Sequence, residues 1–291
     1  MRPGPAANVP AAIAYPFKAA FTRGRSVWWL SRSRASEEGI RILLYHRVAE
    51  DRDELAVAPM RFRAQMEFLA ERDYRVLDVP GAYEALVRGQ LSRPTVGLSF
   101  DDAFRDVAEN ALPTLEELGF GATVFVSTAV ADGRARFDWY RTQPAVLGWQ
   151  EIVELDRHGP LDFEAHTVTH PNLLALDEPT ARHEIARSKS ELEDRLGRAV
   201  TAFAYPTGLF ADRERRLVRE SGFSIAVSCE PGLNVRGTDA YALRRRQIDA
   251  RDSLRDFEAK IGGGHDTPLP LRGAYRRVRY GAGAGRPRCA S

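Results

Sequence analysis

The chain of 291 residues carries 42 Lys and Arg against 40 Asp and Glu, and its formal net charge of +2 argues against a protein-wide field for nucleic acid. Hydrophobic residues make up 44% and charged residues 28%, which is typical of a soluble globular protein with a substantial core. No apolar run approaches the roughly 18 residues of a membrane span, and two distant cysteines, Cys229 and Cys289, exclude a disulfide framework.

Residues 1–38 are expected to form an N-terminal tail. They lack the basic region, the continuous apolar stretch and the small-residue cleavage site of a signal peptide, which favours a cytoplasmic location. Residues 11–30 mix aromatic side chains with Arg. This mixture fits either contact with a membrane surface or a tail with a helical turn or two.

From residue 40 to residue 261, strand-like stretches alternate with helix-like ones. The expected strands cover 40–48, 95–100, 122–126, 161–165, 201–205, 223–228 and 243–248. The expected helices cover 62–69, 113–118, 149–155, 180–196, a stretch between the fifth and sixth strands, and 253–261. This alternation predicts a parallel sheet, and about seven units suffice for a barrel, although periodicity does not exclude an open doubly wound sheet. Residues 261–291 read as a Gly/Arg-rich tail, with six Arg and no acid from 272 onward.

Two short segments carry the chemistry. Ser99-Phe100-Asp101-Asp102 sets two carboxylates at the end of an expected strand, and His166-Thr167-Val168-Thr169-His170 sets two imidazoles four residues apart. Two imidazoles and one carboxylate make a three-ligand set that leaves positions open for water on a hydrolytic metal. The second carboxylate is then available as a base.

Together these segments resemble the signatures of the polysaccharide deacetylases, the NodB-homology or carbohydrate esterase 4 family. The flanks Leu98-Ser99-Phe100 and Pro171-Asn172-Leu173 agree with it. The resemblance implies that Asp101 is the catalytic base and that Asp102, His166 and His170 hold a divalent metal, with Zn²⁺ favoured and Co²⁺ or Ni²⁺ as alternatives. It also implies a distorted (β/α)₇-type barrel of parallel strands and outer helices over residues 39–260.

Phe203-Ala204-Tyr205-Pro206-Thr207-Gly208 resembles a third family motif. The resemblance assigns Tyr205, Pro206 and Thr207 to the substrate and oxyanion site, with the Thr207 N–H as a donor to the oxyanion. Ala204 replaces the Arg that normally pairs with the catalytic Asp. Arg245, within Leu243-Arg244-Arg245-Arg246, is our candidate substitute; the alternative is that these three arginines are surface charges beside a strand.

The general acid of the family is a histidine in an L-x-H motif. His265 lies in a Gly-rich loop, whereas Leu44-Tyr45-His46 ends a strand and resembles the start of the poly-N-acetylglucosamine deacetylase group, a circular permutation of the barrel. We therefore assign His46 as the acid and His265 as a loop residue. His158 and His183 are expected on helix surfaces or ends.

Two further residues bear on the site. Ala103 stands where the family often has Gly, and alanine is expected to force a more ordinary turn beside Asp102. Trp139, in a loop, either stacks on a sugar ring or caps the core.

These residues predict a metal-dependent hydrolase that removes an N-acetyl group from an amino sugar in a poly- or oligosaccharide. The alternative from another class is a degenerate homologue that only binds carbohydrate. A third interpretation is a membrane-surface or nucleic-acid-associated protein acting through its basic tails, although no nucleic acid partner is expected. Relatives of this group are often exported, which keeps an extracellular or cell-envelope location open. A serine hydrolase is disfavoured because no G-x-S-x-G occurs.

Overall fold

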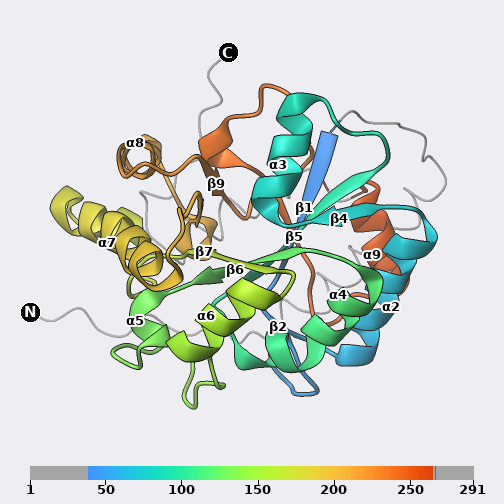
Figure 1. Ribbon diagram of the computed structural model, residues 1–291, viewed down its shortest axis with the longest axis horizontal. Coiled ribbons are helices and arrows are strands. Elements are labelled where there is room, and N and C mark those ends of the chain that lie inside the picture. The colour runs from blue at the N-terminus through green and yellow to red at the C-terminus, as the bar shows by residue number, and fades with distance from the viewer. Residues whose placement is uncertain (1–38, 265, 267–291) are drawn as a thin grey trace, which may run out of the picture.

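A curled sheet of mainly parallel strands forms the centre of the computed structural model, which describes residues 39–264 and residue 266 (Figure 1). Seven parallel strands of the described chain follow one another around it in the spatial order β11, β1, β5, β6, β7, β8, β9. Their bounds are β1 Gly39–Tyr45, β5 Thr95–Asp101, β6 Ala122–Val126, β7 Leu161–Ala165, β8 Ala202–Ala204, β9 Ile225–Val227 and β11 Arg245–Gln247.

Short strands extend or flank this sheet. β4 (Arg75–Leu77) pairs with the start of β5, and β10 (Asn234–Val235) runs antiparallel to the start of β1. β2 (Arg47–Val48) and β3 (Ala56–Val57) form a separate parallel ribbon directly after β1.

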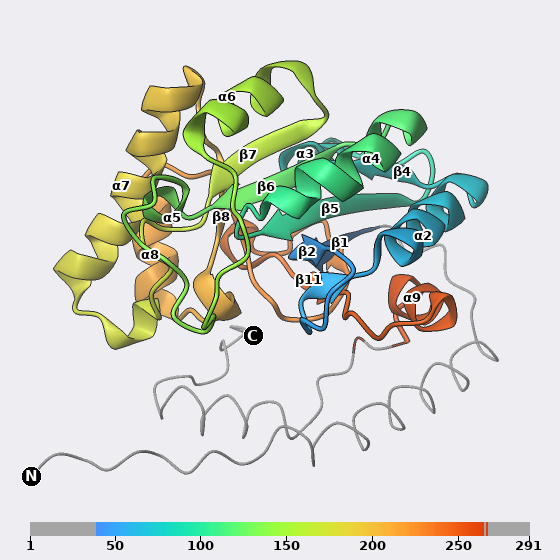
Figure 2. The same ribbon diagram turned by 90° about the horizontal axis from the view of Figure 1, so that it is seen from below.

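Helices surround the outside of the curled sheet, as Figures 1 and 2 show for α2, α4, α6 and α7. Their bounds are α2 Pro59–Glu71, α3 Val79–Arg88, α4 Leu112–Leu118, α5 Thr128–Ala131, α6 Trp149–His158, α7 Glu178–Leu196, α8 Asp212–Glu220 and α9 Leu254–Ile261. A π-helical turn, Val107–Ala111, precedes α4, and short 3₁₀ turns lie at Leu173–Ala175, Pro206–Gly208 and Ala240–Ala242. None of the helices in the described ranges is both long and apolar enough to cross a bilayer.

The ring closes through a narrow seam between β9 and the segment that leads into β11. A single bridge pairs Val227 with Leu243 there, supported by the bonds Ser228 N–H to Leu243 O at 2.8 Å and Leu243 N–H to Ala226 O at 2.9 Å. β11 then pairs with β1. The expected distorted (β/α)₇-type barrel is confirmed, and between β9 and the segment before β11 a single bridge replaces a regular strand pair.

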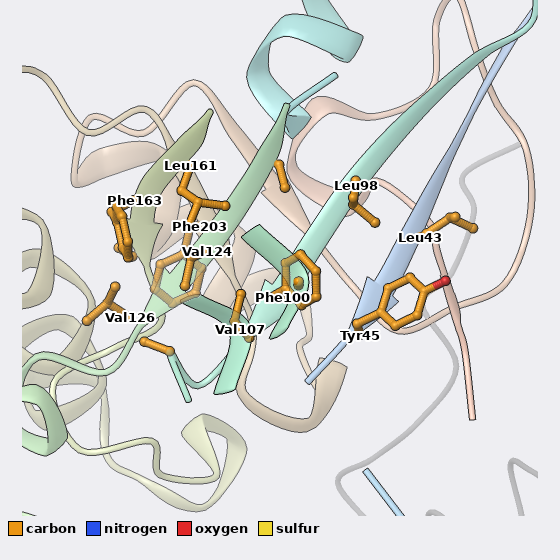
Figure 3. Packing of buried hydrophobic residues seen from close by; sticks show 14 of the residues in the cluster. Leu43, Tyr45, Leu98, Phe100, Val107, Val124, Val126, Leu161, Phe163 and Phe203 are labelled. Carbon is orange, nitrogen blue, oxygen red and sulfur yellow. The ribbon is translucent and has the colours of Figure 1, made fainter. Parts of the chain in front are cut away.

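Apolar side chains from the strands fill the space beneath the helices. Strands of a parallel sheet are covered on both faces, so they read as continuous apolar runs rather than alternating ones. The rings of Tyr45, Phe62 and Phe100 pack together with centroids 5.4–5.9 Å apart, joining β1, α2 and β5. Figure 3 shows this cluster through Leu43, Tyr45, Leu98, Phe100, Val107, Val124, Val126, Leu161, Phe163 and Phe203.

Helix ends follow the capping residues of the sequence. Gly119 and Gly197 end α4 and α7 in the left-handed conformation, and the Ser253 side chain caps the start of α9. The unit β4–α3 was not predicted from the sequence. Its strand has only three residues, too few for a periodicity signal, although Asp78 caps α3 and Gly89 ends it.

Candidate active site

The carboxyl ends of the parallel strands bring the predicted residues to one edge of the barrel. In the register of β1 and β5, Tyr45 pairs with Phe100, so that His46 lies beside Asp101. His166 directly follows β7, and its N–H donates to Val126 O at the end of β6 (2.9 Å). This is the edge at which parallel α/β barrels keep their active sites.

Three side chains converge there in a set that fits a metal ion. The ligand atoms of Asp102, His166 and His170 all lie within 4.8 Å of one another. Asp102 Oδ1 is 3.7 Å from Nε2 of both histidines, is buried, and has no hydrogen-bond partner in the described chain. Bonds of about 2.0–2.2 Å to a shared cation can span such separations. The residues therefore fit a divalent cation, which would satisfy this buried oxygen.

Hydrogen bonding and burial prepare the imidazoles for that role. His166 Nδ1 lies 2.7 Å from Ala204 O, which assigns its proton to Nδ1 and leaves the Nε2 lone pair for a cation. Burial lowers the pKa of His166 to about 4, against the opposing effect of Asp101, and lowers the pKa of His170 well below its ordinary value. Both rings are thus neutral at pH 7, the form that binds metal.

Asp101 is held by the most buried cation of the site. Arg245 is fully buried on β11, and its Nη1 and Nη2 donate to Asp101 Oδ1 (2.6 Å) and Oδ2 (2.8 Å). Arg245 Nε also donates to Ser228 O at 2.9 Å, which fixes the guanidinium plane. Burial would raise the pKa of Asp101, but Arg245 and His166 outweigh it and lower the pKa to about 2. The predicted substitute arginine therefore contacts the predicted base, and the carboxylate stays ionised.

The two carboxylates of the pair differ in their surroundings. Burial and the adjacent Asp101 charge raise the pKa of Asp102 well above its ordinary value, and Arg245 opposes them only weakly. A cation between Asp102 and the two imidazoles would stabilise the ionised form of Asp102. Asp101 is already neutralised by an arginine and needs no cation, so the arrangement favours Asp102 as ligand.

A strained backbone carries these side chains. Asp102, Ala103, Thr167 and His170 all have positive φ, between 50° and 74°. The expectation that Ala103 forces an ordinary turn is wrong, because its φ is 50°. Its carbonyl accepts from Leu147 N (2.9 Å) and the next residue pairs with Val146, and these contacts hold the left-handed conformation that alanine disfavours.

Glu184 on α7 supports the histidine loop and was not predicted from the sequence. Its Oε2 accepts from Val168 N and Thr169 N, both at 2.9 Å, and its Oε1 accepts from the Thr169 hydroxyl at 2.8 Å. The signal that points to it is a buried acid on the apolar face of α7, next to Ile185. Such a residue must satisfy backbone donors or pair with a cation.

Removal of Glu184 is expected to weaken metal binding. Glu184→Ala leaves the Val168 and Thr169 N–H groups unpaired and frees the loop that carries His170, so metal affinity should fall about 10–100-fold. Isothermal titration with Zn²⁺ measures this. Glu193→Ala is the matched control, because Glu193 also accepts a backbone N–H, that of Val200, but lies at the far end of the same helix. Equal affinity in both variants would show that the loop holds its shape without Glu184.

The predicted oxyanion segment forms a tight turn after β8. Thr207 is exposed with φ 56°, and a Cβ on the following Gly208 would lie 2.5 Å from Cys229 N, so only glycine fits there. Tyr205 is buried, stacks on Phe210, and donates its hydroxyl to Tyr241 O at 3.0 Å. Tyr205 and Pro206 therefore fix the course of the backbone at this turn.

His46 and Trp139 stand on either side of this centre. His46 is within electrostatic reach of Asp101; burial lowers its pKa, Asp101 opposes that shift and Arg245 adds to it. The Trp139 ring is 44% exposed, and its centroid lies 4.8 Å from that of His170. It also stacks on Phe137 at 4.6 Å, so it both covers buried rings and presents a free face beside the histidine pair.

The other histidines stay apart from this edge where they are described. His158 and His183 are exposed on α6 and α7. His265 and the predicted tail of residues 1–38 lie outside the described residues, as does nearly all of the tail predicted for 261–291, in which α9 ends at Ile261.

Comparison with known proteins finds polysaccharide deacetylases among the similar sequences. The family model "Polysaccharide deacetylase" matches residues 88–226. The poly-β-1,6-N-acetyl-D-glucosamine N-deacetylase of Staphylococcus aureus (strain MRSA252) is 23% identical over 219 residues, 72% of this chain and 73% of that protein. The Bacillus subtilis protein YxkH is 27% identical over 221 residues, 76% of this chain and 75% of that protein.

Solved structures share the fold. The deacetylase PplD of Streptococcus pyogenes, in complex with acetate, is 25% identical with a TM-score of 0.68, over 77% of this chain and 98% of that chain. IcaB from Ammonifex degensii is 24% identical with a TM-score of 0.66, over 79% and 100%. The signatures, the barrel and these matches lead to one conclusion: residues 88–226 match the polysaccharide deacetylase family, and the barrel around them is similar to that of a solved deacetylase.

Proposed function

We propose that the protein is a metal-dependent hydrolase that removes an N-acetyl group from an amino sugar of a poly- or oligosaccharide. The observation that carries this proposal is the buried, unpartnered Asp102 Oδ1 lying 3.7 Å from two neutral imidazoles, next to a second carboxylate that is already ionised. This is the ligand set of a hydrolytic metal together with its base. Nitrogen and oxygen ligands suit Zn²⁺, with Co²⁺ and Ni²⁺ as alternatives.

Each residue has a part in amide hydrolysis. Asp102, His166 and His170 would hold a divalent cation, and that cation would supply Lewis-acid activation of the acyl carbonyl and of the attacking water. Asp101 accepts the proton of the attacking water, and Arg245 holds Asp101 ionised and in place. The Thr207 N–H donates to the oxyanion as it develops. His46 donates a proton to the leaving nitrogen, and the products are acetate and a free amine on the sugar.

The substrate class rests on relatives and on one aromatic ring. The Staphylococcus aureus relative is named for a β-1,6-linked N-acetylglucosamine polymer, and the PplD structure holds acetate, which is the acyl product expected here. The free face of Trp139 beside His170 suits stacking on a sugar ring. We therefore propose an N-acetylated glycan as substrate.

Acetate release tests this proposal. The full chain, loaded with Zn²⁺, Co²⁺ or Ni²⁺, is incubated with oligomers of N-acetylglucosamine, and mass spectrometry follows the loss of acetyl groups. A loss that needs the metal and stops with a chelator supports the proposal. Glycan binding without any acetate release, with each of the three metals, would instead identify a carbohydrate-binding homologue. The pairing of Arg245 with Asp101 speaks against that alternative, because the charge missing at Ala204 is supplied from β11.

His46→Ala is expected to reduce kcat strongly while metal binding stays intact, because an amine is a poor leaving group without its proton. His265→Ala is the matched control and should retain activity. Steady-state kinetics and metal titration of both variants give the comparison. If His265→Ala is inactive and His46→Ala is active, the general acid lies in the C-terminal segment and the barrel is not permuted.

A further inference from the structure

The two sides of the site are joined by a half-buried polar contact that the mechanism does not use. Tyr140, in the loop between α5 and α6, donates its hydroxyl to Asp53, in the loop between β2 and β3. The same Asp53 oxygen accepts from Arg47 Nη1 at 3.0 Å, and its other oxygen accepts from Leu55 N at 3.0 Å. Asp53 is therefore a fixed acceptor rather than a mobile surface acid.

The segment that holds Asp53 is anchored next to His46. Arg47 Nε donates to Asp106 Oδ2 at 2.8 Å, and Val48 N donates to Asp106 Oδ1 at 3.1 Å. Burial raises the pKa of Asp53, but the Leu55 N–H, the Tyr140 hydroxyl and Arg47 outweigh it and lower the pKa. An ionised acceptor makes the bond from Tyr140 a strong one.

The Tyr140 end of this contact is next in sequence to the exposed Trp139 ring. Trp139 precedes Tyr140 in this loop. Within the loop, Phe137 N donates to Gln143 Oε1 at 2.7 Å, and at its end Arg105 N donates to Ala145 O and Leu147 N donates to Ala103 O, both at 2.9 Å. Tyr140 also meets the buried Phe104 edge-on, with ring centroids 5.9 Å apart. At the tip of this loop, the hydrogen bond from the Tyr140 hydroxyl to Asp53 reaches across to the loop between β2 and β3.

We propose that Tyr140 is a positioning residue: by donating to Asp53 it holds the exposed Trp139 ring against His170, where the ring can meet a bound sugar. The proposal rests on the proposed function and adds a determinant of glycan binding to it. The contacts of Tyr140 are with Asp53, Phe104 and Trp139 rather than with the metal ligands. It acts through Trp139, so its loss should weaken glycan binding and leave the chemical step alone.

Tyr140→Phe tests this, because phenylalanine keeps the ring against Phe104 and removes only the hydroxyl. We expect KM for an N-acetylglucosamine oligomer to rise on the order of tenfold, with kcat and metal affinity within about twofold of the wild type. Tyr241→Phe is the matched control, since the Tyr241 hydroxyl also donates to one acceptor, Phe223 O, at the opposite end of the barrel strands. Its KM should not change.

A double-mutant cycle shows whether Tyr140 acts through Trp139. Trp139→Ala alone should raise KM, and Tyr140→Phe added to it should have no further effect. Additive effects, or a fall in kcat and metal affinity with unchanged KM, would overturn the proposal. If the wild-type chain releases no acetate with any metal, the proposed function fails instead.

Fluorescence gives a readout that needs no activity. The contribution of Trp139 is obtained by subtracting the emission of the Trp139→Phe variant, and acrylamide quenching measures how accessible the ring is. We expect the Trp139 contribution in Tyr140→Phe to be quenched more strongly than in the wild type, in metal-free protein. Identical quenching would show that the ring keeps its place without the hydroxyl and would overturn the proposal.

Discussion

His166→Ala and His170→Ala are each expected to abolish the binding of one divalent ion per chain, and the activity with it. Each substitution leaves two ligands, and two ligands hold a hydrolytic metal poorly. Both rings are buried with neutral imidazoles, and Asp102 Oδ1 lies 3.7 Å from each Nε2, so each ring supplies one atom of the three-ligand set. The loss should therefore be nearly complete for both.

Metal analysis after dialysis measures this loss, with circular dichroism as the check on folding. His158→Ala and His183→Ala are the matched controls, because these histidines are exposed on α6 and α7. Both controls should keep one ion per chain. Stoichiometric metal in His166→Ala and in His170→Ala would refute the ligand assignment.

Asp101→Asn and Asp102→Asn are expected to fail in different ways. Asp101→Asn should keep the metal and lose activity on the order of 10²–10⁴-fold, the effect of removing a general base. Asp102→Asn should lose metal affinity, since its Oδ1 faces both imidazoles. Equal metal loss in the two variants would mean that base and ligand are exchanged.

Asp101→Asn needs a stability control because it leaves the buried Arg245 guanidinium without a counter-charge. Breaking a buried pair from one side costs about 3–5 kcal/mol of unfolding free energy. Thermal unfolding therefore accompanies the kinetics, and Asp101→Asn/Arg245→Met provides the comparison in which both charges are absent. Recovered stability without recovered activity in the double variant would separate the structural part of Asp101 from its catalytic part.

The sequence predicts this site well where local pattern and strand position coincide. Asp101 ends a strand with an apolar run before it, and His166 directly follows the short strand Leu161–Ala165, so their meeting at one edge follows from a parallel sheet. Arg245 was foreseen only through the absence of an arginine at Ala204; its bidentate contact depends on barrel closure, which no local pattern encodes. Ala103 was misjudged because tertiary contacts override its backbone preference.

The residues that escaped prediction bond across long sequence separations. Glu184 reaches the histidine loop from a helix, and Tyr140 reaches Asp53 from another loop, 87 residues away. Their residue types are ordinary for helices and loops. For Glu184 the sequence offers only an acid on the apolar face of a helix, and for Tyr140 it offers no pattern that points to the site.

The narrow seam at Val227 and Leu243 has a consequence for the dynamics of the site. Local opening of a fold begins where few backbone hydrogen bonds resist it, and Arg245 lies just two residues beyond this seam. A fluctuation that parts β9 from Leu243 would break the bond from Arg245 Nε to Ser228 O, which fixes the guanidinium plane, while β11 stays paired with β1. The Leu243 N–H donates to Ala226 O across the seam, so its amide hydrogen exchange should report how often the seam opens. Each opening would also release the contact with Ser228 that orients Arg245 on Asp101.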